Sequence, residues 1–136
     1  MTISPVAPVG TEYWVSKGPA QLYVYRKRMP GARGRVLFLI HGSSLSAIPS
    51  YDLHIPGHDD YSVMDHFARL GFDVWTMDHD GYGRSGQTGT NADIADAVVD
   101  LDLVWPLVAR ESGRTSAIFF GQSGGALRAA AYAQAQ

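Results

Sequence analysis

The sequence predicts an α/β fold built around a mostly parallel sheet. Three short and largely apolar stretches, at residues 36–40, 72–78 and 117–120, are typical of parallel strands that are covered on both faces. Apolar residues recur at helical spacing between these stretches, at residues 61–70 and 93–112. Strands that alternate with helices in this way form βαβ units, so we expect a parallel sheet with helices on both faces.

An antiparallel hairpin is expected ahead of the parallel strands. Residues 12–16 and 21–26 are rich in aromatic and β-branched side chains with partial alternation, which favours strands. The tripeptide Lys17-Gly-Pro19 between them is a turn signal. The hairpin adds two antiparallel strands to the same sheet.

Composition excludes several classes of function. The chain has 136 residues, 46% of them hydrophobic and 18% charged, as expected of a globular domain with an apolar core. A net charge of -2 without a basic cluster argues against nucleic acid and anionic membranes as partners. The absence of cysteine excludes disulfides and cysteine metal sites. We find no cofactor motif, no charged-then-apolar leader, and no apolar run near ~18 residues, so a cytoplasmic location without cofactors is expected.

The clearest chemical signal is Gly121-Gln-Ser-Gly-Gly125, which matches the G-x-S-x-G pattern of a nucleophile elbow. An apolar strand precedes it and a small-residue helix follows it, which is the context that the motif requires. A sharp, strained turn needs minimal side chains at Gly121 and Gly125. Ser123 is therefore the candidate nucleophile. An ordinary strand–turn–helix that happens to contain a serine is the alternative.

Two further motifs follow predicted strands. His41-Gly-Ser-Ser44 comes after residues 36–40, and Asp78-His-Asp-Gly-Tyr-Gly-Arg-Ser85 comes at the end of residues 72–78. Together with the elbow, and in this order, they make residues 20–136 resemble the N-terminal half of the α/β-hydrolase superfamily. Asp80 departs from the Arg or Pro of many relatives, which leaves the substrate class open.

The resemblance implies a mechanism and a set of residues. Ser123 would form an acyl-enzyme, and the backbone N–H groups of Ser43 and Gly124 would form the oxyanion hole, with Ser44 as the alternative to Ser43. It also implies that His41 braces the oxyanion loop and is not the catalytic base. The substrate would be a small-molecule carboxylic ester or a related acyl compound.

The catalytic acid and base of α/β-hydrolases follow the nucleophile in the chain, but residues 124–136 contain no His, Asp or Glu. We therefore expect residues 1–136 to be the N-terminal part of a single, incomplete domain that ends just after the elbow. Either a complementary C-terminal polypeptide or a second copy would pair with the open sheet edge. Acyl transfer by the same fold, and a non-catalytic binding or scaffold role, are the alternative functions.

Other polar residues receive structural interpretations. The loop residues His54, His58, Asp59 and Asp60 match no tight metal-binding spacing, so we expect a solvated loop and no metal. We expect Asp78 and Asp80 to cap turns. Four acidic residues of the 93–112 helix are expected on its exposed side, opposite the apolar stripe: Asp93, Asp96, Asp100 and Asp102.

Overall fold

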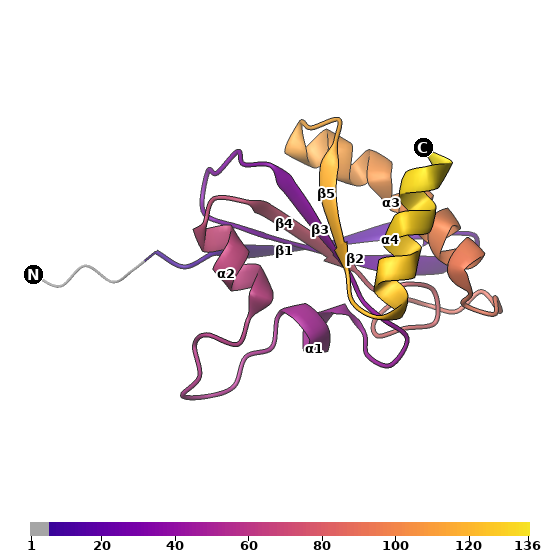
Figure 1. Cartoon of the computed structure of the whole chain (residues 1–136), viewed down its shortest axis with the longest axis horizontal. Helices are drawn as coiled ribbons and strands as arrows, with labels where there is room; N and C mark the ends of the chain where they lie inside the picture. Colours follow the sequence, from indigo (N-terminus) through magenta and orange to yellow (C-terminus); the bar gives the residue numbers. More distant parts are fainter. Residues whose placement is uncertain (1–5) are drawn as a thin grey trace, which may run out of the picture.

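A five-stranded sheet forms the centre of the computed structural model, which describes residues 6–136 (Figure 1). Its strands are β1 (Val9–Lys17), β2 (Ala20–Arg28), β3 (Val36–Ile40), β4 (Asp73–Met77) and β5 (Ala117–Gly121). Its helices are α1 (Ala47–Tyr51), α2 (Val63–Arg69), α3 (Ile94–Ser112) and α4 (Gly124–Ala135). Across the sheet the strand order is β1-β2-β4-β3-β5.

Strand pairing confirms the predicted fold class. The N-terminal strands β1 and β2 form an antiparallel hairpin, and β2 joins the edge of β4, also antiparallel. Strands β3, β4 and β5 are parallel, with β3 between the other two. The carboxyl ends of β3 and β5 therefore meet at one edge of the sheet, where ligands bind in open α/β folds.

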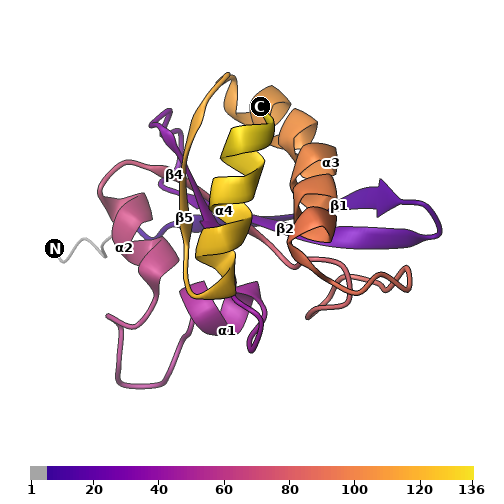
Figure 2. The ribbon, with the colours of Figure 1, turned by 45° about the vertical axis from the view of Figure 1, so that its right-hand side comes forward.

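Alternation along the strands sends side chains to two helical layers. On one face, Phe38, Ile40 and Trp75 pack with residues of α3 and α4, including Leu101 and Tyr132. On the other face, Leu37, Leu39 and Val74 pack with Tyr51 of α1 and with Met64 and Ala68 of α2. Figure 2 shows the sheet between α2 on one side and α3 with α4 on the other.

A buried ion pair ties the hairpin to the parallel strands. Arg26 of β2 donates two hydrogen bonds to Asp73 of β4, at 2.8 and 2.7 Å, and its guanidinium lies over the ring of Trp75. This bidentate geometry pairs the two charges in the buried interior. It explains how β2 can carry the basic residue Arg26 into the core.

The structure corrects one sequence prediction within α3. Asp93 caps the helix in a capping box with Asp96, as expected of its start, and Asp102 is exposed. Asp100, however, is only 1% exposed. It lies one turn before Val104 and next to Leu101, on the buried face, so the prediction that it faces solvent was wrong.

The region between β3 and β4 is also more structured than the sequence indicated. The short helix α1, which the spacing of apolar residues did not predict, lies before the loop that holds His54 and His58. Helix α2 starts at Val63, two residues later than predicted, because the Ser62 hydroxyl accepts a hydrogen bond from the Asp65 N–H and caps the helix there. None of the helices within residues 6–136 combines the length and apolar character that a membrane crossing requires.

Candidate active site

Ser123 lies in the turn between β5 and α4, in a strained backbone conformation. Its φ of 55° and ψ of -123° fall outside the regions that non-glycine residues usually adopt. Its side chain is exposed and caps no helix N–H. The strain expected of a nucleophile elbow is therefore present, and the hydroxyl is left available for chemistry.

The glycines that flank Ser123 allow two backbones to touch. A Cβ added to Gly121 would overlap the backbone of Gly125, and one added to Gly125 would overlap Ile40 O and lie 2.8 Å from His41 O. The first turn of α4 therefore packs directly against the end of β3. This contact brings the loop after β3 alongside Ser123.

The two proposed oxyanion donors border the same point. A Cβ on Gly42 would lie 3.4 Å from Ser123 Cβ and 3.7 Å from Gly124 N, and one on Gly124 would lie 3.7 Å from Ser43 N. Within residues 6–136, the N–H groups of Ser43 and Gly124 donate no hydrogen bond, whereas that of Gly125 does. A hollow of about 140 Å³ opens here, lined by Gly42, Ser43, Ser44, Leu45, Ser50, Gln122 and Ser123. Ser44 therefore remains the alternative second donor.

His41 is fully buried and both of its ring nitrogens are engaged. Nε2 accepts a hydrogen bond from the His79 N–H at 3.1 Å, so Nδ1 carries the proton and donates to Gly42 O at 2.6 Å. Burial, reinforced by the neighbouring His79, lowers the pKa of His41 to about 4. A neutral ring held at both nitrogens cannot take a proton from Ser123, which agrees with a bracing role.

Asp78 and Asp80 hold turns, as predicted. Asp78 accepts hydrogen bonds from the N–H groups of Ala47 and Arg84, at 2.8 and 2.9 Å, and so joins the start of α1 to the turn after β4. Asp80 accepts from the Thr88 N–H at 3.0 Å. Both carboxylates are used by the backbone near the site.

A buried charge cluster that the sequence did not predict lies behind the site. Lys17 of β1 binds Asp100 at 2.5 Å and Asp80 at 2.8 Å. Asp100 also accepts from the Asp80 N–H at 3.0 Å and contacts His79 Nδ1 at 3.2 Å. Burial opposes charge on both groups, but their hydrogen bonds raise the pKa of Lys17 and lower the pKa of Asp100. The partners are far apart in the chain, so no local pattern could have paired them.

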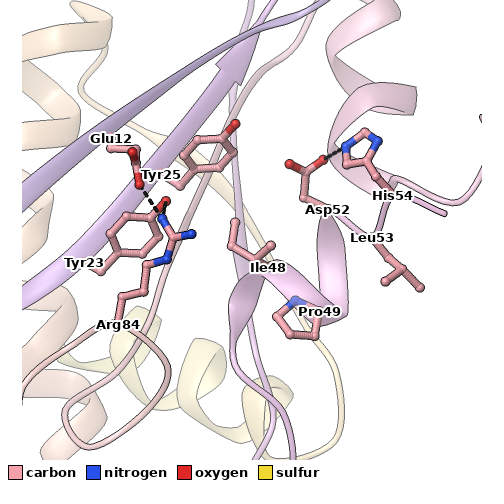
Figure 3. A pocket seen from close by; sticks show the side chains of 9 residues that line it. All are labelled: Glu12, Tyr23, Tyr25, Ile48, Pro49, Asp52, Leu53, His54 and Arg84. Atoms are coloured by element: carbon pink, nitrogen blue, oxygen red, sulfur yellow. Dashed lines mark hydrogen bonds and ion pairs between the residues drawn. The ribbon is translucent and has the colours of Figure 1, made fainter. Parts of the chain in front are cut away.

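A second, larger hollow lies on the side of α1 that carries Ile48 and Pro49. It measures about 520 Å³ and Figure 3 shows its lining, which includes Glu12, Tyr23 and Arg84. The dashed line between Glu12 and Arg84 marks an exposed ion pair of 2.6 Å. Ser123 is not among the lining residues, so this hollow is separate from the candidate nucleophile.

One cluster of potential metal ligands contains a lysine at its centre. Asp52, His54 and Asp65 place one ligand atom each within 4.8 Å of one another. Lys27 Nζ lies 2.9 Å from Asp52, 2.6 Å from Asp65 and 3.2 Å from His54 Nε2. The Lys27 ammonium group thus occupies the position that a metal cation would take among these ligands. Of the four loop residues considered from the sequence, only His54 belongs to this cluster, and His58 instead stacks on Tyr61.

The strand order and a strained serine between β5 and α4 define the chain as an α/β-hydrolase fold. A family model described as serine aminopeptidase, S33, matches residues 58–136. The chain belongs to this family of α/β-hydrolases. No curated protein matches the chain.

Solved structures share the fold at low sequence identity. A predicted CIB-like hydrolase from Thermoplasma acidophilum is 16% identical, with a TM-score of 0.67 over 92% of this chain and 56% of that one. The thioesterase domain from the curacin biosynthetic pathway is 22% identical, with a TM-score of 0.71 over 94% and 40%. An epoxide hydrolase from Vigna radiata is 16% identical, with a TM-score of 0.67 over 92% and 35%. The chain thus spans between about a third and just over half of these proteins.

Replacing Gly125 with valine should destabilise the protein and distort the elbow. The new side chain would overlap Ile40 O and His41 O, and overpacking of this kind costs about 1 to 3 kcal/mol. Ala126→Val, at the exposed neighbouring position, is the matched control and should change stability by well under half of that. Urea denaturation measures both; equal stabilities for the two variants would contradict the packing described here.

Stability should fall as the pH drops from 6.5 towards 4. His41 is buried in its neutral form, with a pKa near 4, and burial also lowers the pKa of His79. The unfolded chain, with ordinary histidines, binds more protons than the folded chain in this window, so acid favours unfolding. His41 alone should make the protein on the order of 2 kcal/mol less stable at pH 5 than at pH 7. Thermal melts of His41→Asn should show a weaker dependence, while His58→Asn, in an exposed loop, should keep the full dependence.

Proposed function

We propose that the protein is a serine hydrolase that cleaves a carboxylic ester or a related acyl compound through an acyl-enzyme on Ser123. The observation that carries the proposal is the Ser123 hydroxyl, which lies on a strained turn and makes no helix-capping hydrogen bond. It borders a hollow that is also lined by Ser43. The N–H groups of Ser43 and Gly124, which donate no hydrogen bond within the described residues, lie close to each other beside this hollow.

In the proposed reaction, Ser123 Oγ attacks the substrate carbonyl carbon while a histidine base removes the hydroxyl proton. The carbonyl electron pair moves to oxygen, and the N–H groups of Ser43 and Gly124 stabilise the resulting oxyanion. The bond to the leaving group then breaks, the leaving group takes the proton, and water releases the acyl group by the same steps. Loss of one donor of this kind typically costs about 3 to 4 kcal/mol of barrier.

The base and its orienting acid are proposed to come from sequence beyond residue 136 or from a complementary polypeptide. His41 is engaged at both nitrogens, and His79 is buried beside Asp100. The partial coverage of the matched structures is consistent with this source.

The nature of the nucleophile favours acyl chemistry over epoxide opening. Epoxide hydrolases that resemble this fold use an aspartate at the elbow, whereas this chain has Ser123. The name of the thioesterase neighbour supports acyl substrates. Acyl transfer to an alcohol or amine would use the same intermediate, and a non-catalytic half-fold is the alternative outside enzymes.

A fluorophosphonate probe should label Ser123 in the active protein. Peptide mass mapping should place the adduct there, and Ser123→Ala should lose both the label and turnover. Ser43→Ala is the matched control: it keeps the backbone N–H and should still label. An adduct on Ser43 or Ser44, with Ser123→Ala still active, would contradict the assignment, and an unlabelled protein would favour the non-catalytic alternative.

Parallel assays with a nitrophenyl ester, an aminoacyl anilide and an epoxide, with and without added alcohol, separate the reaction classes.

We also propose that the outer edge of β5 pairs with another polypeptide segment. Within the described residues β5 pairs only with β3, and Phe120 is 53% exposed. Beside Phe120 an apolar hollow of about 360 Å³ lies between β3 and α2. Open edges with apolar side chains are sites of strand addition.

A chain of residues 1–136 alone should therefore self-associate and show no esterase turnover. Phe120→Glu should reduce association, because it places a charge on the open edge. Leu70→Glu, at a residue that is also exposed but lies at the end of α2, should not. Sedimentation measures the effect; a stable wild-type monomer that unfolds in one cooperative transition and hydrolyses esters would contradict this proposal.

A further inference from the structure

Arg128 is a buried cation that donates to the oxyanion loop. It belongs to α4 and is only 2% exposed. Its Nη1 donates to His41 O at 2.9 Å and lies 3.4 Å from Gly42 O, and its guanidinium stacks over the ring of Tyr82. Among the described residues, no carboxylate lies within ion-pair distance of it. Asp80, Asp93, Asp96 and Asp100 line the same small hollow as Arg128, so its charge is not isolated. Its hydrogen bonds, however, go to the two carbonyls of the loop after β3.

We infer that Arg128 is a positioning residue that aligns the Ser43 N–H with the Gly124 N–H in the oxyanion hole; the inference rests on the function proposed above. Gly42 C=O and Ser43 N–H belong to one peptide unit, and the described chain has no cis peptide. In a planar trans unit the two groups point in opposite directions. Fixing the Gly42 oxygen therefore also fixes the direction of the Ser43 N–H.

Two donors contact the Gly42 carbonyl oxygen. His41 Nδ1–H donates to Gly42 O at 2.6 Å, and Arg128 Nη1 lies at 3.4 Å from the same oxygen while it holds the preceding carbonyl. His41 and Arg128 are themselves in contact at 3.4 Å. The Gly42–Ser43 peptide is thus fixed by groups that are buried and cannot be replaced by bulk water.

The position of Arg128 links the two oxyanion donors through one rigid element. Gly124 is the first residue of α4, and Arg128 follows it by about one helical turn. The helix therefore carries one donor in its own backbone and holds the peptide of the other through the Arg128 side chain. The same nitrogen, Nη1, contacts both carbonyls. A lysine ammonium could donate to them, but it has no planar group to stack on Tyr82 and would not be held in the same place.

The test compares Arg128→Lys and Arg128→Met with the wild type, in the active protein that includes the sequence supplying the acid and base. Arg110→Met, an exposed arginine on α3, is the matched control. Turnover is divided by the number of serines labelled at the end of a fluorophosphonate titration, so that only folded sites count. Both Arg128 variants should lose about 10- to 100-fold in kcat with KM within about twofold, because the donor is misaligned and not deleted. Binding of a boronic acid that forms a tetrahedral adduct should weaken in parallel, and Arg110→Met should match the wild type.

Wild-type kcat per labelled serine in Arg128→Met, or a rise in KM at unchanged kcat, would overturn the inference. If Arg128→Met does not fold, Arg128→Lys decides by the same two criteria, since it keeps the charge and most of the side-chain volume. A wild-type protein that is not labelled at Ser123 refutes the proposed function and the inference together. A labelled wild type with unaffected Arg128 variants refutes the inference alone.

Discussion

The site depends on one close contact between two backbones, where Gly125 of α4 meets the carbonyls of Ile40 and His41 at the end of β3. No side chain fits between these elements. Because they touch, the turn that carries Ser123 and the loop that carries Ser43 lie side by side although 80 positions separate them in the sequence. The strain at Ser123 is tolerated because the surrounding packing leaves the turn no alternative.

Polar groups buried behind this contact keep the loop in place. His79 links the two parts of this network: its N–H binds His41, and its ring meets Asp100, which pairs with Lys17 of the hairpin. The antiparallel hairpin is therefore not only an edge extension of the sheet. Through Lys17 it anchors the turn after β4, which in turn holds the loop after β3.

The features that could be predicted from the sequence are those that depend on a local pattern of residues. The three parallel strands, the hairpin and the strained turn at Ser123 each follow from spacing or from glycine placement, and the structure has all of them. Strand β5 is only partly buried and Phe120 is exposed, so the prediction that residues 117–120 are covered on both faces is not met within the described residues. Asp100 was assigned to the wrong face because a carboxylate within an amphipathic helix normally faces solvent. Its partners Lys17 and His79 come from other elements, so only the folded chain shows that its charge is satisfied. The role inferred for Arg128 is of the same kind, because the carbonyl that it binds is 87 residues away.

The ammonium group of Lys27 also has a consequence for the loop between α1 and α2. Asp52 and Asp65 bracket this loop, and both bind the same ammonium, so a non-covalent link holds the two ends of the loop together in the folded chain. This link separates the exposed residues 53–61 from the strands beneath. Lengthening such a loop costs little entropy once its ends are fixed. Residues 53–61 can therefore change in length and sequence without disturbing the sheet or the candidate site.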